Sequence, residues 1–128
     1  MRYHLDTDFL IFALSAAGPE RRRLTQLAES EAELQMSAVA WYEFSRGPRI
    51  PEQLSIARSF FFDDGIVPFS EELAAIAGEV FRSLGSPRRR AADVAIGVTS
   101  AALRATLLTR NAKDFAGIPH LQVEEVAG

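Results

Sequence analysis

Residues 3–11 of this chain read YHLDTDFLI, which places Asp6 at the end of an apolar run. Residues 2–6 have the composition of a short strand, and residues 8–16 read as a helix that ends at Gly18 and Pro19. We therefore expect Asp6 to lie at the carboxyl end of a largely interior strand. Burying an isolated carboxylate is costly, so an acid at this position requires a further explanation.

The alternation of short strands and helices continues along the rest of the chain. We expect further strands at residues 33–38, 66–69, 105–109 and 121–126, and helices at residues 19–30, 38–46, 52–62, 71–84 and 91–104. Residues 85–90 read as a loop, and residues 110–117 as a turn with one short helical piece. This order predicts an α/β fold with a short central parallel sheet and helices on both faces. The length and the absence of repeats or linkers predict one domain over residues 1–128.

Composition excludes several classes of protein. The chain contains no cysteine, which excludes disulfides, zinc–thiolate sites and thiol catalysis and agrees with a cytoplasmic location. No apolar run approaches the ~18 residues of a membrane span, so we expect no membrane partner. Asp6 and Asp8 interrupt the N-terminal apolar region, which argues against a signal peptide.

The charge pattern neither requires nor excludes a nucleic-acid substrate. The formal net charge of −3 argues against a broad electrostatic footprint for nucleic acid. Arginines nevertheless cluster at residues 21–23, 46 with 49, and 88–90, and arginine is the better bidentate ligand of phosphate. A solvated helix face explains residues 21–23 equally well.

Three further acids stand at the edges of apolar segments. They are Glu43 in VAWYEFSRG, Asp93 in RRAADVAIG and Asp114 in LLTRNAKDF. If the fold brings them to Asp6, each pair of charges at ~5 Å repels by about 3 kcal/mol at an effective dielectric of 20. A bound divalent cation relieves that repulsion, and a site made only of oxygen ligands suits Mg²⁺ or Mn²⁺.

The expected topology supports a shared site. Ligands of open parallel sheets bind beyond the carboxyl ends of the strands, near the point where the strand order reverses. Asp6 ends the first expected strand and Thr109 ends the fourth, with Asn111 and Asp114 just beyond it. These side chains are therefore expected at one edge of the sheet.

Four motifs carry a resemblance to a known family. LDTDFLI, the glutamate of WYEFSRG, the aspartate of AADVAI and LLTRNAKDFAGI occur in the family's order. Over essentially its whole length the chain resembles the PIN domain, and within it the VapC-like toxins of toxin–antitoxin pairs. The resemblance implies a three-layer α/β/α fold and a Mg²⁺-dependent endoribonuclease whose products carry 5′-phosphate and 3′-hydroxyl ends. It also implies a homodimer and a cognate antitoxin whose C-terminal segment lies across the active-site groove, often placing a basic residue among the acids.

The resemblance also implies a set of site residues. The family's acidic quartet maps onto Asp6, Glu43, Asp93 and Asp114, and its hydroxyl and amide positions map onto Thr109 and Asn111. Our hypothesis is that Asp6 and Asp93 hold the metal, while Glu43 and Asp114 act through water or position the attacking water. Thr109 and Asn111 would then fix Asp6 or Asp114. Asp8 departs from the pattern, since many relatives carry asparagine there; it adds a charge near the metal or caps the following helix.

Several simpler readings stay open at this point. Asp6 and Asp93 are also explained as helix caps, Glu43 as a solvated helix residue and Asp114 as a turn residue. The sequence Asp6-Thr7-Asp8 resembles the nucleophile motif of an aspartyl phosphatase, although Lys113 is the only lysine available. A third function is a non-catalytic PIN-like binding module. His4 is expected to be packed, and two of residues Phe60–Phe62 are expected in the core.

Overall fold

A parallel five-stranded sheet forms the centre of the molecule. The computed structural model describes residues 1–127, and its strands follow the order β3-β2-β1-β4-β5, with every neighbouring pair parallel. The chain runs outward from β1 to β3 and then returns to β4 on the other side of β1, so the strand order reverses between β1 and β4. The strands are β1 (Arg2–Leu5), β2 (Glu33–Ser37), β3 (Ile66–Val67), β4 (Thr106–Thr109) and β5 (Gln122–Glu125).

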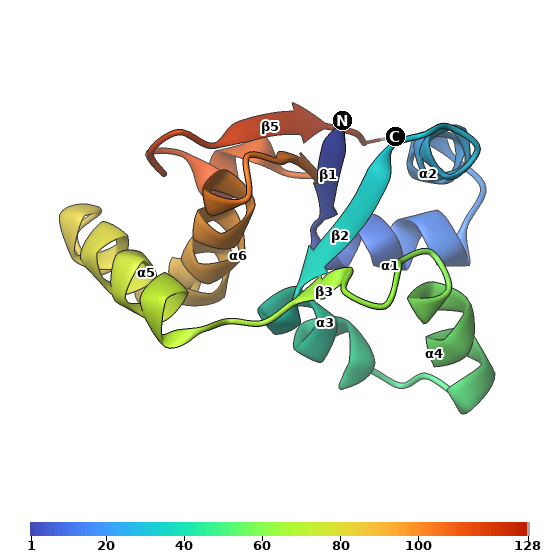
Figure 1. Ribbon diagram of the computed structural model, residues 1–128, viewed down its shortest axis with the longest axis horizontal. Helices are drawn as coiled ribbons and strands as arrows, with labels where there is room; N and C mark the ends of the chain where they lie inside the picture. Colours follow the sequence, from blue (N-terminus) through green and yellow to red (C-terminus); the bar gives the residue numbers. More distant parts are fainter. Residues whose placement is uncertain (128) are drawn as a thin grey trace.

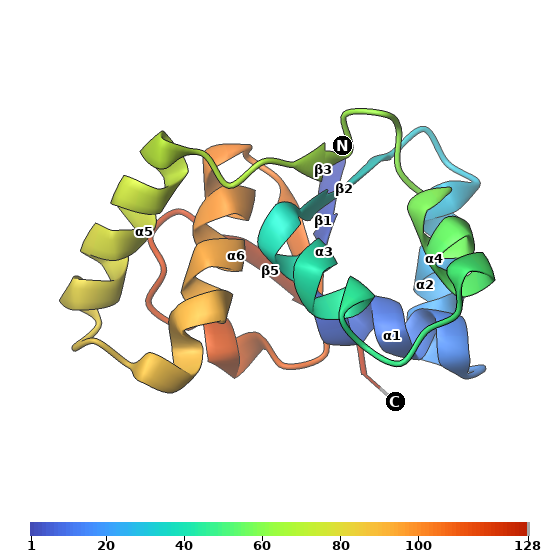
Figure 2. The ribbon, with the colours of Figure 1, turned by 90° about the horizontal axis from the view of Figure 1, so that it is seen from below.

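Helices cover both faces of this sheet, which confirms the expected α/β class. In Figures 1 and 2, α5 and α6 lie on one side of the strands and α1, α2 and α4 on the other, while α3 lies near the carboxyl ends of β1 and β2. No helix in residues 1–127 is long and apolar enough to cross a membrane. The α-helices are α1 (Thr7–Ser15), α2 (Pro19–Ala28), α3 (Ala38–Ser45), α4 (Pro51–Arg58), α5 (Glu71–Ser83) and α6 (Ala91–Ala102). The 3₁₀ helices are η1 (Arg88–Arg90) and η2 (Ala112–Phe115).

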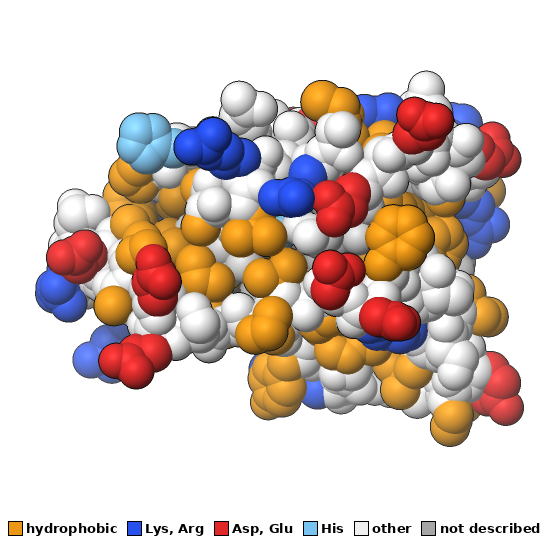
Figure 3. Space-filling view, in the orientation of Figure 1, with side chains coloured by type: hydrophobic (Ala, Val, Ile, Leu, Met, Phe, Trp, Pro, Cys, Tyr) orange, Lys and Arg blue, Asp and Glu red, His pale blue; other side chains and the backbone are white. Residues whose placement is uncertain are grey.

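The core is built on the central strands of the sheet. Strands of a parallel sheet are covered on both faces, so side chains of either orientation are buried. Leu5 of β1, Met36 of β2, and Leu107 and Leu108 of β4 are fully buried. The face of the molecule drawn in Figure 3 mixes charged and apolar side chains.

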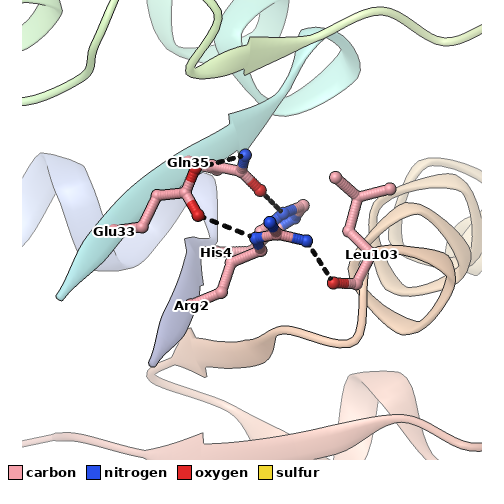
Figure 4. Close-up of polar contacts among 5 residues, drawn as sticks. All are labelled: Arg2, His4, Glu33, Gln35 and Leu103. Atoms are coloured by element: carbon pink, nitrogen blue, oxygen red, sulfur yellow. Dashed lines mark hydrogen bonds and ion pairs between the residues drawn. The ribbon is translucent and has the colours of Figure 1, made fainter.

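His4 is packed inside the sheet, as the sequence predicted. It is 1% exposed, and its Nε2 lies 2.8 Å from Oε1 of Gln35, so this nitrogen carries the proton. At the surface, the guanidinium of Arg2 donates hydrogen bonds to Glu33 and to the carbonyl oxygen of Leu103 (Figure 4). The other ring nitrogen, Nδ1, has no hydrogen-bond partner within residues 1–127, and burial lowers the pKa of His4 to about 4.

Two expected elements differ from the structure. The helix expected over residues 52–62 ends at Arg58, whose guanidinium donates to the carbonyl oxygens of Phe61 and Phe62 and so stabilises a turn there. Phe61 is buried and Phe60 packs against the core, whereas Phe62 is 69% exposed, which agrees with two of the three in the core. The expected loop at 85–90 contains the short helix η1.

Candidate active site

A cleft of about 330 Å³ opens beyond the carboxyl ends of β1 and β4, where the strand order reverses. This is the place at which open parallel sheets bind ligands. The structure brings together in this cleft every site residue that the sequence predicted. They are Asp6, Asp8, Glu43, Asp93, Thr109, Asn111 and Asp114.

Asp6 is held in one orientation by two hydrogen bonds. It precedes α1 as its N-terminal cap, and its Oδ1 accepts from the backbone N–H of Thr7 at 2.9 Å. Its Oδ2 accepts from the hydroxyl of Thr109 at 2.8 Å. Asp6 therefore caps a helix, as one simple reading held, and at the same time lines the cleft with Glu43 and Asp93.

Thr109 and Asn111 connect Asp6 to Asp114. Thr109 Oγ1, which donates to Asp6, also accepts from the backbone N–H of Asn111 at 3.1 Å. The amide Nδ2 of Asn111 then donates to Oδ2 of Asp114 at 2.9 Å. Asp114 lies in η2, and Arg90 anchors that short helix by donating to the carbonyl oxygens of Asp114 and Ala116. A single chain of hydrogen bonds thus orients two of the four predicted acids.

Glu43 reaches the cleft from α3 and is oriented by Thr7. The Thr7 hydroxyl donates to Glu43 Oε1 at 2.9 Å, and the Thr7 backbone N–H is the one that binds Asp6. Glu43 also lies 3.8 Å from the guanidinium of Arg46, which immediately follows α3. Sequence reasoning did not assign a role to Thr7, although its position between two acids in LDTD was a signal for one.

Asp93 lies in the first turn of α6 and is half-buried. Its side chain makes no hydrogen bond within the part of the chain that the structure describes. Burial raises the pKa of Asp93 to about 7, and the charges of Asp6, Asp114 and Glu43 add to that rise against a smaller opposing effect of Arg90. A carboxylate that is repelled by three others and has no donor of its own is suited to a cation.

The pKa of Asp6 is raised as well. Burial raises its pKa to about 6, even though the hydrogen bonds from Thr109 and Thr7 favour the charged form, and Asp8 and Glu43 add repulsion. Asp8 itself is exposed in the first turn of α1. Its contribution to the cleft is one of charge rather than of hydrogen bonding.

The donor set fits a hard divalent ion, although the side chains do not form a finished cage. Within residues 1–127, no group of three or more aspartate, glutamate, histidine or cysteine side chains is arranged to hold a metal ion by itself. Mg²⁺ keeps several waters and commonly takes only one or two carboxylates directly, so a complete protein cage is not required. Asp6 and Asp93 fit this requirement best, because each loses repulsion when a cation binds.

Comparison with known proteins identifies the family. The family model described as the PIN domain matches residues 3–121. The chain belongs to the PIN domain family. No curated protein sequence matches the chain.

Solved structures carry the same fold. This PIN domain is similar to a chain of the VapBC2 complex from Rickettsia felis bound to a promoter DNA fragment, with 25% identity, 98% of each chain covered and a TM-score of 0.74. It is also similar to a chain of a toxin–antitoxin complex from Klebsiella pneumoniae, with 26% identity, 93% of this chain and 94% of that chain covered and a TM-score of 0.72. FitAcB from Neisseria gonorrhoeae shares the fold at 22% identity and a TM-score of 0.72, over 94% of this chain and 95% of that chain.

The region that matches the PIN domain contains all seven predicted site residues, from Asp6 to Asp114. The structure adds four lining residues to which sequence reasoning assigned no role in the cleft: Thr7, Ile11, Arg46 and Arg110. Arg46 was noted only as part of a basic cluster with Arg49. Arg110 adjoins Thr109 and Asn111, so its place in the LLTRNAKDF motif was the available signal.

Proposed function

We propose that this PIN domain is a Mg²⁺-dependent endoribonuclease and the toxin of a toxin–antitoxin pair. The observation that carries the proposal is the gathering of Asp6, Glu43, Asp93 and Asp114 in one cleft at the reversal of strand order. Four carboxylates so placed suit a hydrolase that uses a hard divalent ion, with Mn²⁺ as a possible substitute for Mg²⁺.

Each side chain has a defined part in this proposal. Asp6 and Asp93 would hold the ion, and Glu43 and Asp114 would orient the attacking water or hold the ion's waters. When bound, Mg²⁺ supplies Lewis-acid polarisation of the phosphate and lowers the pKa of water. Thr109 keeps Asp6 facing the cleft, while Thr7 and Asn111 do the same for Glu43 and Asp114. Asp8 adds negative charge at the rim.

An antitoxin would bind in an apolar groove that adjoins the acidic cleft. The groove has a volume of about 250 Å³ and shares Ile11 with the cleft, so one extended segment can reach both. It suits a peptide with apolar side chains followed by a basic residue that enters the acids. The similarity to chains of toxin–antitoxin complexes supports this partner, and the proposal includes a homodimer acting on RNA in the cytoplasm. The groove is lined by Ile11, Leu14, Phe44, Pro48, Arg49 and Ile56, together with Ser15 and Gln53.

The two alternative functions receive less support. An aspartyl phosphatase requires a lysine beside the nucleophile, and Lys113 is exposed and does not line the cleft. A non-catalytic module has no need of four acids and their hydrogen-bonded supports, all of which are present.

The deciding experiment incubates the purified full-length chain with diverse cellular RNAs. We expect cleavage with Mg²⁺, none with EDTA, and 5′-phosphate ends on sequencing, with no cleavage by a folded Asp6→Asn variant. Hydrolysis of a small phosphomonoester without RNA cleavage would instead indicate the phosphatase. No hydrolysis of either substrate, after removal of any bound antitoxin, would indicate a binding module.

A further inference from the structure

The acidic cleft poses a problem for an RNA substrate. Five acids line it, and the whole chain carries a formal charge of −3, so a polyanion is repelled before it reaches the site. A bound divalent ion offsets only part of that charge. Within residues 1–127, the basic side chains that line the cleft are Arg46 and Arg110.

Arg46 lies on the α3 side of the cleft. It immediately follows α3, and its side chain is 58% exposed. Its guanidinium is 5.2 Å from the ring centroid of Tyr42, itself 60% exposed, and 3.8 Å from Glu43 Oε2. An exposed ion pair of that length is weak, so Arg46 gives it up at little cost when a phosphate competes.

Arg110 lies in the loop after β4, between Thr109 and Asn111, whereas α3 follows β2 on the other side of β1. Its guanidinium carbon stands 3.5 Å from the ring centroid of Phe12, which is 40% exposed, and its Nε donates to Glu20 Oε2 at 2.8 Å. These contacts use one face of the Arg110 guanidinium and its Nε. Its two terminal nitrogens make no hydrogen bond within the described residues and are available to an anion.

The two arginines therefore share one arrangement. Each lines the acidic cleft, one from α3 and one from the loop after β4, and each guanidinium lies over a partly exposed aromatic ring. The stacking restricts the guanidinium, so less conformational entropy is lost when it binds phosphate. Exposed aromatic rings and arginine planes also accept stacked bases of single-stranded RNA.

The remaining arginines near the site are engaged elsewhere. Arg90 donates to two carbonyl oxygens of the η2 segment, and Arg49 donates to the carbonyl oxygen of Phe44 beside the apolar groove. Neither lines the acidic cleft.

We infer that Arg46 and Arg110 bind RNA phosphates on opposite sides of the scissile phosphodiester. Phe12 and Tyr42 hold the two guanidinium groups in place and offer stacking surfaces to the flanking bases. This inference rests on the proposed ribonuclease function and adds the residues that select a single-stranded polyanion. A pair of arginine–aromatic stacks favours RNA over an acidic peptide, which offers carboxylates but no bases to stack.

The test compares Arg46→Ala, Arg110→Ala, the two lysine substitutions and an Arg82→Ala control in the full-length protein. Arg82 is exposed on α5 and does not line the cleft. Cleavage of a single-stranded oligoribonucleotide is measured with Mg²⁺ across a range of salt concentrations. Binding of the same RNA and of a polyglutamate peptide is measured in an Asp93→Asn background, in which we expect no cleavage.

We expect each alanine substitution to raise KM by roughly tenfold while kcat changes by less than about threefold. The slope of log affinity against log salt should become shallower by about 0.7 for each lost phosphate contact to a single strand. Lysine should restore the slope, because it restores the charge, and Arg82→Ala should match the unsubstituted protein. A change in thermal stability alone would not alter this slope.

Other outcomes separate this inference from the proposed function. Cleavage with an unchanged KM and salt slope in both alanine variants would overturn the inference and leave the ribonuclease standing. RNA binding with an arginine-dependent slope but no cleavage would support the phosphate contacts of the two arginines and overturn the ribonuclease. Arginine-dependent binding of polyglutamate, with RNA binding unaffected, would overturn it in favour of an acidic protein partner.

Discussion

The hydroxyl of Thr109 donates a hydrogen bond to Oδ2 of Asp6 at 2.8 Å, across 103 positions of sequence. The contact exists because β1 and β4 are neighbours and Leu5 is paired with Leu108, so the residues that follow those partners meet at the end of the sheet. Thr109 is fully buried. A neutral side chain therefore sets the direction of the most deeply buried acid in the cleft.

Removing the hydroxyl should impair cleavage more than folding. For Thr109→Val we expect kcat/KM on RNA to fall by about 10- to 100-fold, because Asp6 loses the donor that orients it. Thr109→Ser keeps the donor and should stay within about threefold. The measurement is steady-state cleavage of a defined oligoribonucleotide, with circular dichroism as the check on folding. Full activity in a folded valine variant would contradict the role.

The acids of the cleft should differ in importance. We expect Asp93→Asn to abolish RNA cleavage and growth arrest, whereas Asp8→Asn, at an exposed position, should lower kcat/KM by less than about tenfold. Both are tested by expression in cells and by cleavage in vitro. An equal loss of cleavage in the two variants would place Asp8 among the metal ligands. Persistent cleavage by Asp93→Asn would exclude Asp93 as a metal ligand.

Mg²⁺ alone should stabilise the fold. At an ion concentration 100 times the Kd, binding to the native state adds about 2.7 kcal/mol to the free energy of unfolding. Thermal unfolding with Mg²⁺ and with EDTA measures this effect without any RNA. Asp93→Asn should remove most of the stabilisation, while Arg82→Ala should keep it. An unchanged midpoint in the unsubstituted protein at all Mg²⁺ concentrations would argue against the ion site.

The metal-free protein should lose stability as the pH rises. The pKa values of Asp6 and Asp93 are raised in the folded state to about 6 and about 7, from an ordinary value of 3.8. Folding therefore favours the protonated forms, so their contribution is complete below about pH 4 and is lost as the pH rises through about 7. The rise of the Asp6 pKa corresponds to at most about 3 kcal/mol.

Urea unfolding in EDTA between pH 4 and pH 8 measures that loss. Asp6→Asn and Asp93→Asn should each show a smaller decrease than the unsubstituted protein, because asparagine does not titrate. An equal decrease of the unfolding free energy with pH in all three proteins would show that folding does not raise the pKa values of Asp6 and Asp93.

The titration of His4 should change stability with pH in the opposite direction, so that stability is lost as the pH falls. Its folded-state pKa is lowered to about 4 from 6.5, so its contribution is present above about pH 6.5 and is lost as the pH falls toward 4. His4→Gln keeps a donor without this titration. The stability gap between the two proteins should narrow by about 2 kcal/mol between pH 7.5 and pH 4.5. A gap that is constant with pH would mean that the protonated ring finds a partner for Nδ1.

Sequence periodicity predicted most of the fold but missed some boundaries. Each strand and α-helix was expected near its observed position, because local apolar spacing and caps such as Ser70 depend on near neighbours. The end of α4 was missed by several residues, because the turn at Phe60–Phe62 depends on Arg58 binding carbonyl oxygens beyond the helix. That interaction has no periodic signature.

The candidate site, like the fold, was predicted only in part from the sequence. The sequence alone determined which acids stand at the edges of apolar segments, and motif order pointed to Asp6, Glu43, Asp93 and Asp114. Only the tertiary structure decided that Thr7 orients Glu43 and that Arg46 and Arg110 line the same cleft. The physical reason is range: strand and helix patterns arise from residues a few positions apart, whereas a contact such as Thr109 to Asp6 requires the order and register of β1 and β4.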